Sequence, residues 1–243
     1  MSWKFVGKGL RRRRLCGLAV GFLVLGGGVA TAQEAFISSN AEMVKVLREV
    51  QADPARLALY RSRGAELELL CAYCHGKGGN SSKPRFPSLA GQNPLYLLDQ
   101  FERFSAGHRE DFTGVMPTLA GRLSTEDRVA LALYYAGNPQ RPSGYDAARA
   151  RRGKPVFEKY CLQCHGRDGR GKGGYARLAG QQTTYLAETL KLFKTGDPRK
   201  MRSRHSDIMT TLARLMTDEQ IVDVAHYLAS LGGGPASSLA RRP

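Results

Sequence analysis

The sequence predicts an all-α protein built from two tandem domains of similar fold. Three observations support this: the second half of the chain repeats motifs of the first, apolar residues recur at helical spacing after recognisable helix starts, and no stretch alternates apolar and polar residues as a half-buried strand would. The chain has 243 residues, a length that suits one or two domains.

An internal repeat defines a first unit, residues 64–138, and a second unit, residues 153–232. The matching segments keep their residue type and order at offsets of 89 to 93: residues 71–76 and 161–166 (C-x-x-C-H-G), 89–92 and 178–181 (L-A-G-Q), Tyr96 and Tyr185, and Met116 and Met209. Offsets that drift so little indicate two copies of one fold with small insertions in the loops.

Helices are expected at matching places in the two units. Before them, residues 33–62 form a lead-in with two short helices separated by a proline. Within each unit a short helix leads to the first cysteine, and another follows L-A-G-Q from Tyr96 or Tyr185. The last helix begins at a hydroxyl cap, Ser124 or Thr217, with a polar side chain three residues later, close to a capping box.

The C-x-x-C-H motif indicates the chemistry of both units. Two thiols one helical turn apart can add to the two vinyl groups of one porphyrin, and the adjacent histidine can bind its iron. A zinc ribbon needs cysteine pairs about 15–20 residues apart, and a disulfide framework gives no reason for a histidine after each pair. The sequence therefore predicts two covalently bound haem c groups, held by these residues: Cys71, Cys74, His75, Cys161, Cys164 and His165.

A methionine is the expected ligand on the other side of each iron. Met116 and Met209 occupy one registered position, each eight residues before the cap of the last helix, and both are expected on loops. A methionine thioether there raises the reduction potential and closes the iron to small molecules. Met201 and Met216 compete in the second unit, although Met216 directly precedes the cap and is expected to pack in the core. The other histidines are out of register and are expected to be surface or structural residues: His108, His205 and His226.

Residues 1–32 have the pattern of an export signal. Basic residues precede an apolar stretch that ends in an A-x-A site, so cleavage before Gln33 is expected. An uncleaved membrane anchor is the alternative, but the apolar run is short of the roughly 20 residues that a span needs. Removing residues 1–32 discards Cys16 and lowers the net charge from +16 to +10. Export argues against nucleic acid as a partner, and the basic excess favours an acidic redox partner or an anionic membrane surface.

Together these motifs resemble the cytochrome c4 family of periplasmic dihaem cytochromes, over about residues 64–232. The resemblance implies two class I cytochrome c domains whose haems are close enough to exchange electrons. It also implies that a backbone carbonyl accepts a hydrogen bond from the ring N–H of each haem-binding histidine: Pro87 for His75, and Ala176, where a proline is missing, for His165. The expected division is a signal peptide (1–32), lead-in (33–62), first domain (63–138), linker (139–152), second domain (153–233) and C-terminal tail (234–243).

The resemblance implies an electron carrier in the periplasm, not an enzyme. Its expected partners are redox proteins, namely a terminal oxidase, a dehydrogenase or a cytochrome bc1-type complex, with peripheral membrane association as a further possibility. Two alternatives stay open: the cytochrome subunit of a specific dehydrogenase, and a dihaem enzyme such as a peroxidase or a sulfur-compound dehydrogenase. Such an enzyme needs one haem with an open, histidine-held or cysteine-held distal site, which the two registered methionines argue against.

Overall fold

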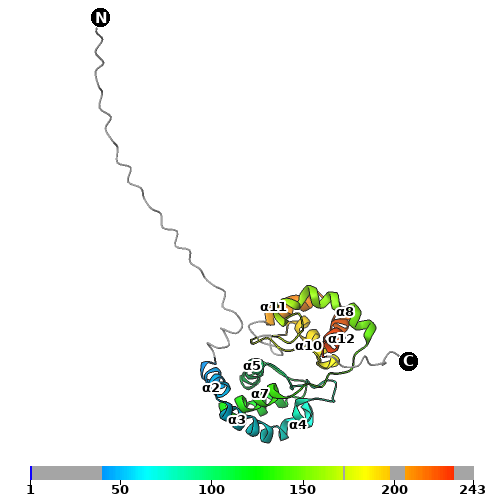
Figure 1. Ribbon diagram of the computed structural model, residues 1–243. Coiled ribbons are helices and arrows are strands. Elements are labelled where there is room, and N and C mark those ends of the chain that lie inside the picture. The colour runs from blue at the N-terminus through cyan, green and yellow to red at the C-terminus, as the bar shows by residue number, and fades with distance from the viewer. Residues whose placement is uncertain (2–39, 172, 198–205, 233–243) are drawn as a thin grey trace.

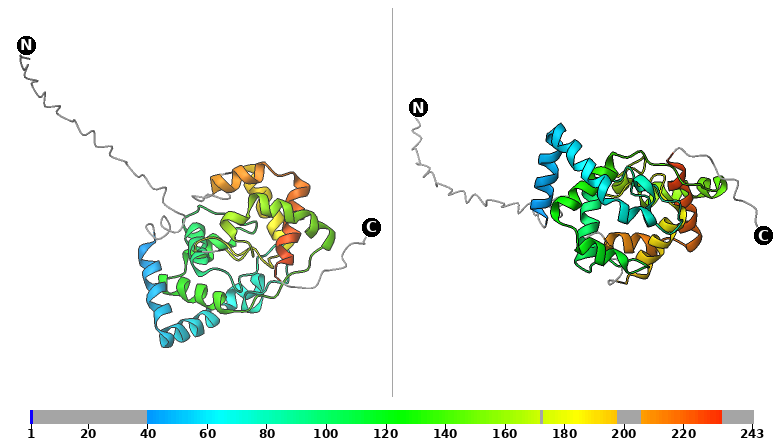
Figure 2. Two further views of the ribbon diagram at one scale, coloured as in Figure 1. Left: turned by 45° about the horizontal axis from the view of Figure 1, so that its top comes forward. Right: turned by 90° about the horizontal axis from the view of Figure 1, so that it is seen from below.

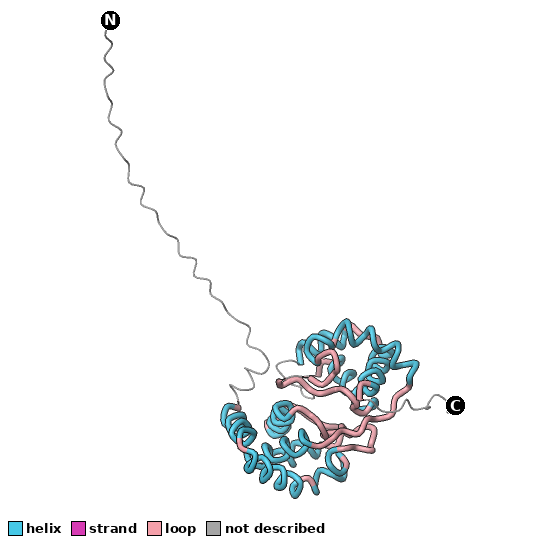
Figure 3. The backbone as a smooth tube through the Cα atoms, viewed as in Figure 1, coloured by secondary structure: helices cyan, strands magenta, loops and turns pink. Residues whose placement is uncertain are grey.

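The structure, a computed structural model, describes residues 1, 40–171, 173–197 and 206–232. Across these ranges the regular elements are helices and no β-strand forms, so the prediction of an all-α fold is confirmed (Figure 1). The helices form two groups, one for each repeat unit, and long loops gather between the groups (Figure 3).

The first group contains the lead-in and the first unit. Its first two helices meet at Pro54, where the Asp53 carboxylate accepts the N–H groups of Ala55 (2.9 Å) and Arg56 (3.2 Å). Proline suits this position because its missing N–H would have no partner within the helix. The elements of this group are α2 (Ala41–Ala52), α3 (Pro54–Leu67), α4 (Leu69–His75), the 3₁₀ turn η1 (Lys77–Gly79), α5 (Pro94–Ser105), α6 (Val115–Gly121) and α7 (Thr125–Gly137).

The lead-in packs into the core of the first unit. Met43, Val44, Leu47 and Val50 recur at helical spacing on α2, and all four are buried in one cluster with side chains of α5 and α7. Burial of side chains this large stabilises a fold by about 1.5–3 kcal/mol each. Figure 2 shows α2 at the outer edge of the first group. The helix α3 is continuous from Pro54 to Leu67, so the boundary predicted between residues 62 and 63 falls inside it. This helix packs along α7 of the first unit.

The second group repeats this design. Its helix α8 packs along α12 as α3 packs along α7. α8 begins inside the linker predicted at residues 139–152, where the Asp146 carboxylate accepts the Arg149 N–H at 2.8 Å. The elements of this group are α8 (Ala147–Tyr160), α9 (Leu162–His165), α10 (Thr183–Thr195), α11 (Ser206–Arg214) and α12 (Asp218–Ser230).

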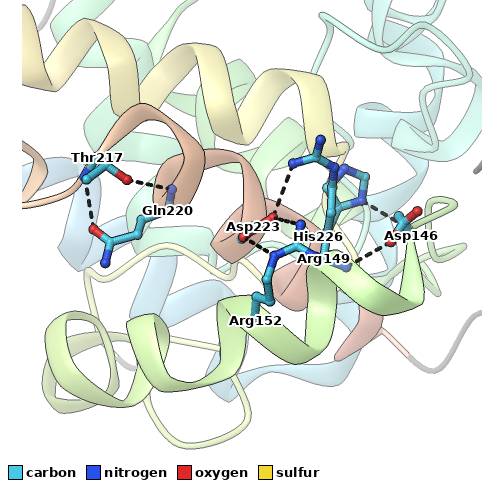
Figure 4. A network of polar contacts seen from close by, with 7 residues as sticks. All are labelled: Asp146, Arg149, Arg152, Thr217, Gln220, Asp223 and His226. Atoms are coloured by element: carbon cyan, nitrogen blue, oxygen red, sulfur yellow. Dashed lines mark hydrogen bonds and ion pairs between the residues drawn. The ribbon is translucent and has the colours of Figure 1, made fainter.

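The last helix of each unit begins at the predicted cap. In the first unit Ser124 Oγ accepts the Asp127 N–H at 3.1 Å. In the second, Thr217 Oγ1 accepts the Gln220 N–H at 3.1 Å, and the Gln220 side chain accepts the Thr217 N–H at 2.9 Å (Figure 4). This second arrangement is a complete capping box, which satisfies two backbone donors that the helix leaves unpaired.

A buried carboxylate joins α8 to α12. Asp223, whose side chain is 5% exposed, accepts hydrogen bonds from Arg152 (2.8 and 2.9 Å) and from Arg149 (3.2 Å) (Figure 4). His226 Nδ1 accepts the Asp146 N–H at 2.9 Å, which requires a neutral ring, and burial together with the nearby Arg149 lowers the pKa of His226. Arg149 and Arg152 of α8 therefore help to hold α8 against α12 in the second unit.

Among the described residues, no helix has both the length and the apolar character needed to cross a bilayer. Several predictions concern residues that lie outside the described ranges. These are the signal peptide (1–32), the tail (234–243), Met201 and His205.

Candidate metal centres

Each C-x-x-C-H motif ends a helix at a glycine. α4 ends at Gly76 (φ 74°) and α9 ends at Gly166 (φ 78°). Glycine adopts a positive φ without the steric penalty that other residues meet. A Cβ at Gly76 would also lie 2.0 Å from the carbonyl oxygen of Asn80, so the turn after the first histidine has no room for a side chain.

The two motif histidines lie in matching environments. His75 Nδ1 is 2.9 Å from the Pro87 carbonyl oxygen, and His165 Nδ1 is 3.0 Å from that of Ala176. A carbonyl oxygen only accepts, so Nδ1 carries the proton and Nε2 keeps a free lone pair. Burial lowers the pKa of both rings, against the opposing effect of the carbonyls, and favours the neutral form that binds metals. The backbone contact expected from the family resemblance is therefore present in both units.

The four motif cysteines have intermediate burial, and no disulfide joins either pair. Cys71 packs against the first core and Cys161 against the second. Burial raises the pKa of the Cys71 thiol and raises that of the Cys161 thiol to about 12, so both would stay protonated at neutral pH before haem is attached. Within the described ranges, no group of three or more histidine, cysteine, aspartate or glutamate side chains is placed to hold a metal ion.

Met116 and Met209 lie in short helices, so the prediction that both are on loops is wrong. Met116 is in the first turn of α6 and Met209 is in α11. In the first unit the Asp111 carboxylate favours the helix, because it accepts the N–H groups of Thr113 (2.9 Å) and Met116 (3.0 Å) and so satisfies a donor that the first turn leaves unpaired. Each methionine is half-buried and packs against the core that the first motif cysteine of its own unit also contacts.

The other candidate ligands in the described residues have structural or surface positions. Met216 is 3% exposed and lies in the second core, as predicted for a packing residue. His108 is exposed, and His226 is engaged with the Asp146 backbone.

The loops that carry the two carbonyl acceptors meet between the units. Gln181 Oε1 accepts the Ser88 N–H and Gln181 Nε2 donates to the Ser88 carbonyl, both at 2.8 Å. In the opposite direction Gln92 Oε1 accepts the Arg177 N–H at 2.6 Å, and Gln92 Nε2 donates to the Arg177 carbonyl at 2.9 Å. Gln92 and Gln181 are 6% and 4% exposed. Gln92 and Gln181, which occupy the same position in the two repeats, therefore each bond to the backbone of the opposite unit.

Arg109 places a cation at this interface. Its guanidinium donates to the Tyr185 hydroxyl of the second unit at 3.0 Å and to the Gln100 side chain. Its Nε is buried and has no hydrogen-bond partner in the described part of the chain. A buried guanidinium N–H in this state is suited to a carboxylate acceptor.

Comparisons with known proteins agree with this geometry. A family model described as cytochrome c matches residues 150–232. Cytochrome c-552 of Acidithiobacillus ferridurans is 34% identical over 174 residues, which cover 66% of this chain and 73% of that protein. Cytochrome c4 of Pseudomonas aeruginosa is 30% identical over 174 residues, which cover 67% and 84% of the two chains. The chain belongs to the cytochrome c4 family.

Structural similarity extends over both units of this cytochrome. The crystal structure of reduced recombinant cytochrome c4 from Pseudomonas stutzeri matches with a TM-score of 0.63 at 28% identity, over 68% of this chain and 95% of that one. A relative named thiosulfate dehydrogenase electron acceptor, from Stutzerimonas stutzeri (strain A1501), is 29% identical over 220 residues, or 84% and 93% of the two chains. The protein is thus a dihaem cytochrome with class I domains that binds covalent haem c and carries electrons.

The side chains of this cytochrome fit haem c. Each unit offers a neutral imidazole with a free Nε2, a thioether against the same core, and two cysteine thiols. The unpaired Nε of Arg109 offers a buried donor of the kind that a haem carboxylate accepts.

Sequence reasoning missed the interface residues Gln92, Gln181 and Arg109. The two glutamines had a signal in the sequence, because the same polar residue ends L-A-G-Q in both repeats without belonging to an apolar helix face. Arg109 had none, since a single arginine on a loop resembles a solvated charge until its tertiary partners are known.

Proposed function

We propose that this cytochrome carries electrons in the periplasm, from a respiratory donor to a terminal oxidase or another redox protein. The observation that carries the proposal is the duplicated arrangement of a neutral histidine and a methionine on one core, so that neither unit is built differently for catalysis. The predicted export signal and the basic net charge support the location and an acidic docking face on the partner. When bound, haem supplies reversible one-electron oxidation and reduction.

The proposed site residues are the same in kind for the two haems. The carbonyl of Pro87 or Ala176 orients the histidine. The methionine would supply the second protein ligand to a bound iron and close it to small molecules, and the apolar core would exclude water. The proposed assignment is covalent attachment to Cys71 and Cys74 with His75 and Met116 as axial ligands, and covalent attachment to Cys161 and Cys164 with His165 and Met209 as axial ligands.

The proposed domain division follows the helices. The first haem domain, predicted at residues 63–138, extends back to Pro54 so that it includes all of α3. The second, predicted at residues 153–233, extends back to Ala147 so that it includes all of α8. These extensions are proposed because α3 and α8 each pack along the last helix of their own unit.

A second candidate function is electron acceptor for one particular dehydrogenase. The relative whose name describes it as a thiosulfate dehydrogenase electron acceptor favours this alternative. The two functions differ in the donor, since a dedicated acceptor is reduced quickly by one dehydrogenase and slowly by other donors. An enzyme role would instead require an accessible iron, and rapid binding of one cyanide per protein at neutral pH would favour it over both carrier functions.

The purified exported protein is expected to carry two covalent haems. Its polypeptide should begin near Gln33, and its mass should equal that of the residues from Gln33 onward plus two haems. The colour should stay with the polypeptide after acid–acetone extraction, because a thioether bond is not broken by acid. As a control, the double variant Cys161→Ser, Cys164→Ser should retain one haem. A mass with a single haem in the parent protein, or a disulfide in either motif, contradicts the ligand assignment.

Electron transfer to the partner is expected to slow as ionic strength rises. The charge of +10 that remains without residues 1–32 would attract an acidic partner, and salt screens such attraction beyond about 8–10 Å near physiological ionic strength. The effect is measured as the stopped-flow rate of electron transfer to the partner, at salt concentrations from about 20 to about 500 mM. An uncharged small-molecule reductant is the control and should show little salt dependence. A partner rate that does not change with salt would mean that the basic residues play no part in docking.

A further inference from the structure

The interface glutamines form hydrogen-bond chains that lead from each unit to the haem-binding histidine of the other. The Pro87 carbonyl, which accepts from His75 Nδ1, belongs to the same peptide group as the Ser88 N–H. That N–H donates to Gln181 Oε1 of the second unit at 2.8 Å. One continuous chain therefore runs from the imidazole of the first unit, through a single peptide group, to a side chain of the second.

The second chain is the mirror of the first. His165 Nδ1 lies 3.0 Å from the Ala176 carbonyl, whose peptide group donates the Arg177 N–H to Gln92 Oε1 of the first unit at 2.6 Å. Separations of 85 and 93 residues between the bonded partners exclude a local turn as the origin of these contacts.

Both amides are fixed in orientation. Gln92 Oε1 also accepts the Asn93 N–H, and Gln181 Oε1 also accepts the Gln182 N–H, each at 2.9 Å. An N–H can only donate, so each amide oxygen, and not its nitrogen, must face the peptide group of the other unit. The burial of both glutamines keeps water from replacing these bonds.

We propose that Gln92 and Gln181 are positioning residues that set the reduction potential of the haem in the opposite unit. A peptide N–H that donates polarises its own carbonyl and makes that oxygen a stronger acceptor. A stronger acceptor draws more of the Nδ1 proton and makes the imidazole a better donor to iron, which favours the oxidised state. This inference rests on the assignment of His75 and His165 as axial ligands.

The two chains are not equally robust. Pro87 has a fixed φ, which restrains its carbonyl even without the glutamine, whereas Ala176 has no such restraint. Loss of Gln92 is therefore expected to affect the second haem more than loss of Gln181 affects the first.

The test uses Gln92→Met and Gln181→Met in the full-length holoprotein, followed by equilibrium redox titration with visible spectra. Methionine keeps the length of the side chain and removes both amide bonds. Gln92→Met should raise the potential of the second-unit haem, with an increase of about threefold in the ratio of reduced to oxidised iron at fixed potential, or about 28 mV for one electron. Gln181→Met should raise the reduction potential of the first-unit haem only, and by less than Gln92→Met raises that of the second-unit haem. If Gln92→Met does not yield holoprotein, Gln92→Asn shortens the reach and tests the same bond.

Two further variants make the outcome decisive. The titration has two one-electron steps, one for each haem. Met116→His and Met209→His should each lower the reduction potential of the haem in their own unit and so show which step belongs to which unit. Gln182→Met is the matched control, because it removes another interface bond, from Gln182 Nε2 to the Ser81 carbonyl. The backbone N–H that bonds to Gln181 Oε1 is kept in this variant, so both hydrogen-bond chains stay intact. The control should move neither step by more than the error of the titration.

The possible results separate this inference from the proposed function. If neither Met116→His nor Met209→His moves a step in the redox titration, the methionine ligands of the proposed function are wrong. A glutamine variant that then shifts only one of the two potentials still supports the inference, because the hydrogen-bond chains end at His75 and His165. If the histidine variants each move one step but a glutamine variant shifts the haem of its own unit or no haem, only the inference is overturned. Equal shifts of both haems in the glutamine variants and in Gln182→Met would mean general loosening of the interface, which also overturns it.

Discussion

Gly153→Ala is expected to unfold the second unit under conditions in which the first unit stays folded. A Cβ at this position of α8 would lie 2.1 Å from the Asp223 carbonyl oxygen and 2.8 Å from the Val224 Cα. These are backbone atoms of α12, so no side chain can turn away and the two helices must separate. Overpacking typically costs about 1–3 kcal/mol and occasionally more. A collision with backbone places Gly153→Ala at about 3 kcal/mol or above.

Gly64→Ala should act in the same way on the first unit. Its Cβ would lie 2.5 Å from both the Ala130 carbonyl oxygen and the Tyr134 Cβ of α7. The contacts are slightly longer than those at Gly153, so the expected loss of stability is smaller. It should again be confined to the unit that carries the substitution.

Thermal unfolding followed at the Soret band and by circular dichroism measures both effects. A loss of 3 kcal/mol corresponds to a drop in Tm of about 12 °C or more for a domain of this size. Gly174→Ala is the matched control, because no atom lies within 4 Å of the added Cβ and its φ is not positive. It should change stability by less than about 0.5 kcal/mol. Equal melting of Gly153→Ala and Gly174→Ala would contradict the close crossing of α8 and α12.

Replacing Met209 is expected to lower the reduction potential of one haem and leave the other nearly unchanged. A thioether favours the reduced iron, so its loss stabilises the oxidised form. Met209→His should give a low-spin haem whose potential falls on the order of 0.1 V or more, within the roughly 0.8 V range that axial ligands span. Met209→Ala should give an open or water-bound haem that binds cyanide.

The sulfur-to-iron charge-transfer absorption of the oxidised protein identifies the ligand. Its amplitude should halve in both Met209 variants, because Met116 supplies the other half. Met216→Leu is the control in the core: Met216 is buried, and a near-isosteric swap should cost less than about 1.5 kcal/mol without changing the absorption. Met201→Leu should also leave the absorption intact. If either control halves it, the ligand of the second haem is that methionine and the repeat register is misleading.

The sequence alone determined the features that depend on neighbouring residues or on the repeat. The C-x-x-C-H motifs predicted the attachment chemistry, and hydroxyl residues at positions 124 and 217 predicted the start of α7 and α12. A cap acts on backbone groups within one turn, so its signal lies within a few residues of sequence. The duplicated spacing also predicted that Met116 and Met209 would occupy equivalent places, and each does pack on the core of its own unit.

Only the tertiary structure decided the conformation around these methionines and the contacts between the units. α6 has seven residues, too short for helical periodicity to reveal and too short to be stable without its surroundings. The need for glycine at positions 64 and 153 came from helices that cross after 60 or more intervening residues. The glutamine chains join loops 85 and 93 residues apart. Sequence spacing specifies none of these contacts, because they form only when packing of the two cores brings the loops together and excludes the water that would otherwise bond to them.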